Sequence, residues 1–355
     1  MVSKKPRVFY SLGVSFVIFL VVLFSFHKIP APREQNGVLY DIQRLHDNRS
    51  NLNQSSKFSL FEDIKIKSPS QIETPLGPPN SADIGATRNL YEFGFDIPNI
   101  ALCPDLGTSL KILILILSAP SHMDKRMAIR QTWGSIARRK DIQMSFFLGR
   151  TTSDLTSKIE EESSNFGDIV AGRFIDTYRN LTLKTTSIME WIDHYCPKVK
   201  YILKTDDDMF INLPKLLGFV ASHQDSKRTF FGKLARSWGV LRDFRSKYYV
   251  SPEQFAPSYY PDFVTGPAYL FTSDIVRESY VEALRAKFMP LEDVFMTGLV
   301  ARVIKVTHVH CPEFYNWDKK VGACDLKHYI SVGASGTQGM FDLYKKLLDS
   351  PNTCG

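Results

Sequence analysis

From Lys111 onward, the chain alternates between apolar runs and segments in which apolar residues recur at helical spacing. The first run, KILILILSAP, is continuously apolar and stops at Pro120, which is typical of a strand buried on both faces. The same criteria predict strands at 142–149, 168–174 and 200–205, and helices at 122–139, 153–166 and 181–196. Strands and helices that alternate at this spacing predict an α/β domain with a mostly parallel sheet.

Another apolar stretch lies near the N-terminus. Residues 8–26 (VFYSLGVSFVIFLVVLFSF) carry no charge and are long enough to cross a hydrocarbon core of roughly 30 Å. Lys4, Lys5 and Arg7 precede the stretch, which favours a cytosolic N-terminus. A cleaved signal peptide is the alternative, but FSFHKIP lacks a small-x-small cleavage site. We therefore expect a cytoplasmic tail at 1–7, a transmembrane signal-anchor at 8–26 and a luminal remainder.

Between this stretch and the α/β pattern, residues 27–104 are rich in Ser, Asn, Gln and Pro. The run KSPSQIETPLGPPNSA is the part least able to bury a core. We interpret 27–104 as a luminal stem and 105–355 as the folded domain. The aromatic segment NLYEFGFDIPNI at 89–100 can instead dock on that domain.

Composition and charge narrow the choice of partners. The chain is 44% hydrophobic and 23% charged, which is typical of a globular protein. The net charge of +7 suits an anionic partner, but the basic residues are scattered, which disfavours nucleic acid. Glycosylation sequons at Asn48, Asn53 and Asn180 agree with a luminal address, as do five cysteines beyond the apolar stretch. Because five is odd, at least one cysteine is free or pairs between chains, and the pairing stays open.

Three aspartates stand between two apolar runs in KYILKTDDDMFINL, residues 200–213. In an extended segment, side chains two residues apart share a side, so Asp206 and Asp208 point together and Asp207 points away. Two converging carboxylates repel unless a cation lies between them, and hard oxygen ligands select Mg²⁺ or Mn²⁺. The pattern predicts a metal–diphosphate site at the carboxyl end of a strand. A solvated acidic turn, or a cap for the following helix, is the alternative.

A second acidic pair, Glu292–Asp293, opens an amphipathic segment in KFMPLEDVFMTGLVARV. Acidic residues are common in the first turn of a helix simply because they suit its dipole. Beside the apolar FMPL stretch, a carboxylate can instead serve as a general base with a shifted pKa. The sequence leaves both interpretations open.

Five segments occur in the order seen in the β-1,3-galactosyltransferase family: AIRQTWG, NLTLKT, KTDDDMFIN, YYPDFVTGPAYLFT and LEDVFMTGL. The chain resembles this family, which includes β-1,3-N-acetylglucosaminyltransferases and, more distantly, the Fringe enzymes, over roughly Lys111 to Val332. The resemblance implies a GT-A fold, which is a Rossmann-like domain, with a UDP-sugar donor and Mn²⁺ or Mg²⁺. The anchor, stem and catalytic domain also resemble Golgi glycosyltransferases, which implies a single-pass type II Golgi membrane protein.

The resemblance also implies residue roles. Asp208 would be the principal metal ligand, with Asp206 nearer the nucleoside. Asp293 would be the catalytic base that takes the proton from the acceptor's 3-hydroxyl. A single displacement would then invert the anomeric centre and give a β-1,3 bond. The matched positions on the donor side are Arg130, Trp133, Lys184, Asp207, Gly266 and Glu292, although Trp133 can equally be a core residue.

The chain departs from the family at two places. It reads TGPAY where the family has SGTGY, so Pro267 and Ala268 leave the donor open between UDP-galactose, which we favour, and UDP-N-acetylglucosamine. At Gly333 the family usually has a metal-binding histidine, so the second protein ligand is unassigned. An inactive relative that binds glycans is disfavoured because both acidic sites are intact. We expect an acceptor glycan on a protein, lipid or glycosaminoglycan, and a homodimer stays open.

Overall fold

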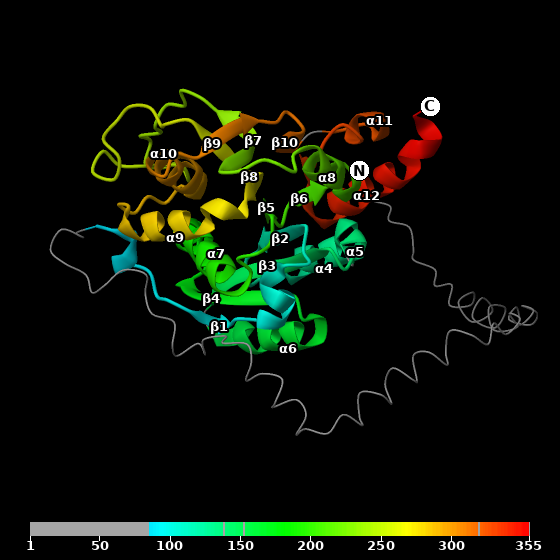
Figure 1. Cartoon of the computed structure of the whole chain (residues 1–355), viewed down its shortest axis with the longest axis horizontal. Helices are drawn as coiled ribbons and strands as arrows, with labels where there is room; N and C mark the ends of the chain where they lie inside the picture. The colour runs from blue at the N-terminus through cyan, green and yellow to red at the C-terminus, as the bar shows by residue number, and fades with distance from the viewer. Residues whose placement is uncertain (1–84, 138, 152, 319, 355) are drawn as a thin grey trace, which may run out of the picture. The chain divides into compact units, whose positions relative to one another are not determined.

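The computed structural model describes residues 85–354 except 138, 152 and 319 (Figure 1). The expected tail, signal-anchor and most of the expected stem, with the sequons at Asn48 and Asn53, lie outside the described residues. Among the residues that are described, no helix is long and apolar enough to cross a membrane.

A mixed sheet, in which most neighbouring strands are parallel, runs through the centre of the domain (Figure 1). Within the described residues its strand order is β1-β4-β3-β2-β5-β8-β7-β9. The strands are β1 (Phe95–Ile97), β2 (Ile112–Leu117), β3 (Ile142–Arg150), β4 (Ile169–Ile175), β5 (Tyr201–Asp206), β7 (Thr229–Ala235), β8 (Phe263–Thr272) and β9 (Thr307–His310). Strands β4, β3, β2 and β5 are parallel, whereas β8 is antiparallel to both neighbours. These four parallel strands are the ones that the sequence pattern predicts.

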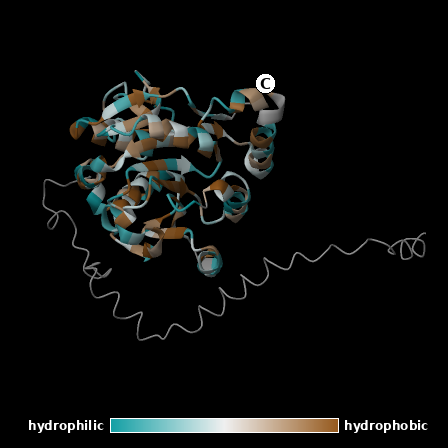
Figure 2. Ribbon diagram, turned by 45° about the vertical axis from the view of Figure 1, so that its right-hand side comes forward, coloured by the Kyte–Doolittle hydropathy of each residue, from teal (hydrophilic) through white to brown (hydrophobic). Residues whose placement is uncertain are grey.

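Side chains that alternate along β2 divide the core into two layers. Leu113, Leu115 and Leu117 join the cluster on one face, and Ile112, Ile114 and Ile116 join the cluster on the other. The first layer includes residues of α7 (Leu181–Tyr195) and α9 (Val276–Arg285), and the second includes residues of α4 (Met123–Gln131), α8 (Leu213–Ser222) and α12 (Gly336–Thr353). Figure 2 shows hydrophobic stretches in many of the strands and helices of the domain. Helices on both faces explain why the β2 run carries no polar residue.

The domain also contains further helices and turns. They are α5 (Trp133–Ile136), α6 (Thr156–Phe166), the π-helix η9 (Val294–Val300), α10 (Ala301–Val303) and α11 (Ala323–Leu326), with 3₁₀ turns η3 (Thr87–Asn89), η4 (Ile100–Leu102), η5 (Pro104–Gly107), η6 (Ser153–Leu155), η7 (Tyr178–Asn180) and η8 (Ser273–Ile275). A small sheet in the order β10-β11-β6 joins Phe314–Asp318, Ser331–Gly333 and Met209–Ile211. Its strand β11 runs antiparallel to β6, which directly follows the aspartate triplet.

Two expected helices differ from the sequence pattern. The helix expected over 122–139 is two helices, because Thr132 leaves the helical region with φ −113° and ψ −119°. The Thr132 hydroxyl donates to the carbonyl of Ala128 at 2.7 Å, a type of bond that bends helices. The amphipathic segment expected after Asp293 is the π-helix η9, in which every residue except Leu299 is buried. A helix that is hydrophobic all round occupies the core rather than the surface.

The folded domain includes residues that the sequence pattern places in the stem. Strand β1 pairs antiparallel with β4, and the side chains of Tyr91 and Phe95 are buried in the core. Cys103 forms a disulfide with Cys196 at the end of α7. The boundary expected between residues 104 and 105 therefore does not separate a stem from the fold. The aromatic segment at 89–100 docks because its rings bury apolar surface.

The other three cysteines are also placed. Cys324 forms a disulfide with Cys354, and Cys311 is buried and free. One unpaired thiol agrees with the odd number of cysteines in the sequence.

Candidate active site

A cavity of about 660 Å³ opens at the carboxyl end of β5. Segments that are far apart in the sequence meet there. Among the lining residues are Asp206 and Asp208 after β5, Gly266 in β8, Glu292 and Asp293 before η9, and Gly333 and Ala334 at the end of β11. The carboxyl ends of parallel strands are where open α/β sheets bind ligands. This cavity is therefore the candidate active site.

The three aspartates separate as the i, i+2 rule predicts. Asp206 and Asp208 both line the cavity, and the Asp206 side chain is 37% exposed. Asp207 is buried on the other side of the turn. Its carboxylate accepts a hydrogen bond from the Lys125 ammonium at 3.0 Å and contacts the His122 ring at 2.7 Å. Asp207 thus fixes the start of α4 and does not reach the main cavity.

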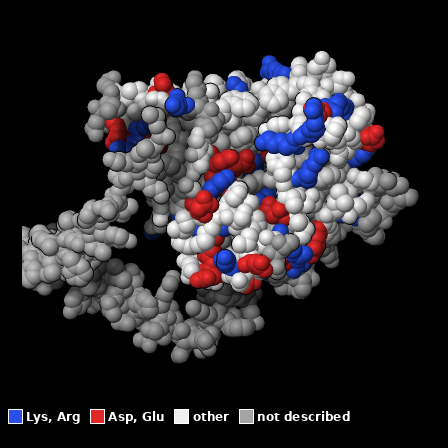
Figure 3. All heavy atoms as spheres, turned by 180° about the vertical axis from the view of Figure 1, so that it is seen from behind, with Lys and Arg blue, Asp and Glu red and all other residues white. Residues whose placement is uncertain are grey.

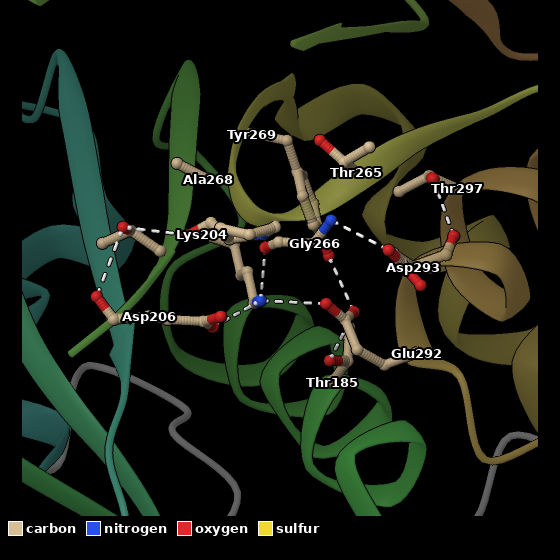
Figure 4. A network of polar contacts seen from close by, with 12 residues as sticks. Thr185, Lys204, Asp206, Thr265, Gly266, Ala268, Tyr269, Glu292, Asp293 and Thr297 are labelled. Carbon is tan, nitrogen blue, oxygen red and sulfur yellow. Dashed lines mark hydrogen bonds and ion pairs between the residues drawn. The ribbon is translucent and has the colours of Figure 1, made fainter. Parts of the chain in front are cut away.

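Lys204 connects three parts of the site (Figure 4). Its side chain is 2% exposed, and its ammonium group donates to Asp206 Oδ1 at 2.8 Å, Glu292 Oε1 at 2.9 Å and the carbonyl oxygen of Gly266 at 2.7 Å. Although burial opposes the charge, the carboxylates of Asp206 and Glu292 hold the pKa of Lys204 above its ordinary value. An ammonium ion with three oxygen acceptors locks β5, β8 and the loop before η9 together.

Glu292 is the buried anion of this network. Its other oxygen accepts hydrogen bonds from the Thr185 hydroxyl at 3.0 Å and, more weakly, from the Tyr269 hydroxyl at 3.3 Å (Figure 4). Burial raises the pKa of Glu292, while Lys204 opposes the rise. With its oxygens bound on both sides, Glu292 organises the site and leaves the neighbouring Asp293 as the accessible carboxylate.

Asp293 lies at the cavity wall with a fixed orientation. Its Oδ2 accepts a hydrogen bond from the backbone N–H of Gly266 at 2.9 Å, and its Oδ1 accepts one from Val294 N–H at 2.8 Å. Burial raises the pKa of Asp293, which makes it a stronger proton acceptor than an ordinary aspartate. A Cβ at Gly266 would lie 3.0 Å from Glu292 Oε1 and 3.3 Å from Asp293 Oδ2. A side chain at this position would therefore push both carboxyl groups away by a few tenths of an ångström.

The charges of Asp206 and Asp208 suit a divalent cation. Burial raises the pKa of Asp206 to about 7, with the charge of Asp208 adding to the rise and Lys204 opposing it. Among the described residues there is no group of three or more His, Cys, Asp or Glu side chains that could hold a metal ion. Gly333 lines the same cavity but has no side chain that could coordinate a metal. Two carboxylates fit a hard cation that also coordinates substrate phosphates.

The sequence model of the family described as galactosyltransferase matches residues 124–312, which span the acidic cluster. The chain belongs to the galactosyltransferase family. It is 32% identical to β-1,3-galactosyltransferase 1 of Homo sapiens over 240 residues, covering 66% of this chain and 73% of that protein. It is 31% identical to β-1,3-galactosyltransferase 5 of Homo sapiens over 244 residues, covering 67% and 79%.

Similar solved structures share little sequence with this galactosyltransferase-family chain. The apo structure of the bifunctional glycosyltransferase WbbM covers 68% of this chain and 50% of that one, at 11% identity and a TM-score of 0.39. The galactosyltransferase LgtC, in complex with donor and acceptor sugar analogues, covers 66% and 95%, at 9% identity and a TM-score of 0.36. At these TM-scores the likeness is slight.

Besides Asp207, three residues matched to the donor side do not line the cavity of this galactosyltransferase-family protein. Arg130 is buried and pairs with Glu162 at 2.7 Å and Asp168 at 2.7 Å. The indole of Trp133 is fully buried and donates to the carbonyl of Met209, at the start of β6. These two side chains hold α4 and α5 in place, because their polar groups are satisfied inside the protein.

Lys184, the third of these residues, is also bound to groups inside the protein. Its buried ammonium group donates to the carbonyl of Ser118 at 2.7 Å and to Asp176 at 2.8 Å. This joins α7 to the loop after β2. The sequon residue Asn180 precedes α7, and its amide donates to the carbonyl of Ile175 at 2.9 Å. Glycosylation of Asn180 stays a prediction.

Lys204 is the main site residue that our sequence reasoning missed. The available signal was the strand period, because Lys204 and Asp206 are two residues apart in KTDDD and so share a side of β5. A lysine within a buried strand needs a fixed anion. Its second anion, Glu292, is 88 residues away and could not be read from the sequence.

Proposed function

We propose that this protein is an inverting β-1,3-galactosyltransferase. It transfers galactose from UDP-galactose to the 3-hydroxyl of an acceptor sugar on a glycoprotein, glycolipid or glycosaminoglycan. The observation that carries the proposal is the set of four carboxylates, Asp206, Asp208, Glu292 and Asp293, around one cavity in a member of the galactosyltransferase family.

Each carboxylate has a separate role in this mechanism. Asp293 accepts the proton of the acceptor's 3-hydroxyl while that oxygen bonds to the anomeric carbon of galactose. The bond from this carbon to the diphosphate breaks in the same step, and UDP leaves with the bonding electrons. The N–H of Gly266 keeps Asp293 aimed into the cavity, and Lys204 with Glu292 holds that backbone in place.

Asp208 and Asp206 would hold Mn²⁺, or alternatively Mg²⁺. When bound, the metal neutralises the charge of the departing diphosphate. Gly333 adds no ligand, so substrate phosphates and water would complete the coordination.

The location is part of the proposal. The uncharged stretch at 8–26 would anchor a single-pass type II protein in the Golgi membrane, with the catalytic domain in the lumen. The two disulfides support this location, because disulfides persist in the oxidising secretory lumen.

UDP release by the purified full-length protein in detergent tests the reaction. UDP-galactose and UDP-N-acetylglucosamine are supplied separately, with Mn²⁺ or with a chelator, together with a panel of neutral and anionic sugar acceptors that have a free 3-hydroxyl. We expect metal-dependent release from UDP-galactose and a product that carries a β-1,3 bond. If only UDP-N-acetylglucosamine is turned over, the donor is UDP-N-acetylglucosamine and not UDP-galactose. If neither donor releases UDP and the protein does not bind UDP in the presence of Mn²⁺, the assignment as an enzyme is wrong.

A further inference from the structure

The long connection between β7 and β8, residues 236–262, carries no helix or strand of its own. It is nevertheless held in one shape by Arg242. The guanidinium group of Arg242 donates to the carbonyl oxygens of Val250 at 2.8 Å, Phe255 at 2.6 Å and Pro257 at 3.0 Å. Long loops in a compact domain are usually functional when they are ordered. We refer to residues 236–262 as the β7–β8 loop.

Aromatic side chains from this loop and from two other segments line the active-site cavity. Four of them are between 43% and 50% exposed: Tyr178, Trp238, Tyr248 and Trp317. Large exposed apolar side chains gathered around one cavity mark a binding surface. The C–H faces of sugar rings pack on aromatic rings of this kind, whereas a nucleoside diphosphate needs the acidic, metal-holding end of the cavity.

These four aromatic side chains, which we call the aromatic wall, line the same cavity as the proposed base, Asp293. Burial raises the pKa of the Tyr178 hydroxyl, and the charges of Asp293 and Asp206 add to the rise. Tyr178 is therefore within electrostatic reach of the proposed base, Asp293. Because the wall and Asp293 share one cavity, we assign the wall to the sugar that presents its hydroxyl to Asp293.

One cation in the wall lacks an anionic partner. Lys247 also lines the cavity, and its ammonium nitrogen lies 5.4 Å from the ring centre of Tyr178 and 4.9 Å from that of Tyr248. Among the described residues no carboxylate forms an ion pair with Lys247. By contrast, Arg245 in the same loop pairs with Asp243 at 2.9 Å. The two rings hold Lys247 at the cavity with its charge still available to a ligand.

One face of the domain carries both signs of charge. Figure 3 shows this face from behind, with acidic side chains gathered near the middle and Lys and Arg side chains gathered toward the upper right. A ligand that reaches from Asp293 toward the β7–β8 loop would meet the positive charge of Lys247, which lines the same cavity.

We propose that the acceptor glycan is anionic and that Lys247 recognises its negative group. The group is a carboxylate, as in a uronic acid, or a sulfate ester, and the sugar rings pack on the aromatic wall. This inference rests on the proposed function, because it names the class of acceptor that the transfer uses. Lys247 is a specificity-determining residue and takes no part in the bond changes.

Matched acceptors test the proposal. Benzyl β-N-acetylglucosaminide is compared with its 6-sulfate, and methyl β-glucoside with methyl β-glucuronide, because each pair differs only in the charged group. We expect the charged member of at least one pair to have a KM about fivefold lower, and the advantage to shrink at high salt. The pair that shows the advantage identifies the sulfate or the carboxylate. Equal KM values within both pairs would overturn the proposal.

Three variants separate charge recognition from other effects. Lys247→Gln should remove the advantage of the charged acceptor and leave the KM of the neutral acceptor and of UDP-galactose within twofold. Arg245→Gln, a change of charge in the same loop, should keep the advantage. Trp238→Ala should raise the KM of charged and neutral acceptors alike, through lost packing. A Lys247→Gln variant that raises only the donor KM would assign Lys247 to the diphosphate and overturn the proposal.

Binding measured without turnover keeps this inference distinct from the proposed function. Ligand-observed NMR in the presence of UDP and diamagnetic Mg²⁺ should detect binding of the charged acceptor, and the affinity should fall about fivefold in Lys247→Gln. Such binding without UDP release from any donor would refute the transfer reaction and leave the anionic site standing. If UDP is released with neutral acceptors but neither charged probe binds selectively, the anionic site is refuted and the transfer reaction is not.

Discussion

Replacing Lys204 with methionine removes the ammonium group that bonds Asp206, Gly266 and Glu292 but keeps most of the side-chain volume. Glu292 then lies buried without its cation, and it folds as the neutral acid. Holding a carboxyl group neutral costs about 1.36 kcal/mol for each unit by which the pH exceeds its ordinary pKa of about 4.3. The cost at pH 7 is about 4 kcal/mol, within the range for breaking a buried ion pair.

The same arithmetic makes the effect depend on pH. At pH 5.5 the cost falls to about 2 kcal/mol, because less free energy is needed to keep Glu292 protonated. Urea unfolding at both pH values measures the difference between wild type and Lys204→Met. The double variant Lys204→Met/Glu292→Gln should recover most of the stability, because a neutral amide can still accept the bond from Thr185.

Lys158→Met, at an exposed lysine in α6, is the matched control and should change the free energy of unfolding little. An equal loss for Lys204→Met at both pH values would refute the reasoning. So would a double variant that is no more stable than Lys204→Met alone, because the buried charge of Glu292 would then not be the cause.

Three further predictions concern single residues. Asp208→Asn should abolish metal-dependent turnover, and its free energy of unfolding should stay within about 1 kcal/mol of wild type because the side chain is exposed. If the activity of this variant depends on Mn²⁺ as that of wild type does, Asp208 is not a metal ligand. Asp293→Asn should abolish turnover but retain UDP binding in calorimetry, and near wild-type activity would contradict its role as base. Burial raises the pKa of Glu190 to about 7 from an ordinary 4.5, with hydrogen bonds from Tyr91 and Gly94 opposing the rise. The folded state therefore holds the proton more tightly, and the free energy of unfolding should fall by up to about 3 kcal/mol as the pH rises from 4.5 through 7. Glu190→Gln should flatten this pH profile, and an unchanged slope in that variant would show that another group causes it.

Much of the fold could be predicted because its signals are local. The β2 run is apolar at every position since helices cover both faces of the sheet, and α6 and α7 both lie within segments that the sequence predicts to be helical. The two-residue period of an extended chain predicted that Asp206 and Asp208 separate from Asp207, and in the structure the turn formed by Asp207 and Asp208 produces this separation. These features depend only on near neighbours in the sequence.

Tertiary structure decided which charged residues serve the cavity. Arg130 and Lys184 carry the same charge as Lys204, yet the first two are bound to carboxylates elsewhere and only Lys204 reaches Asp206 and Glu292. The sequence alone does not say which anion will lie beside each buried cation, because those partners come from distant strands and helices. A buried charge is stable only with its partner in place, so the packing of the whole domain determines the active site.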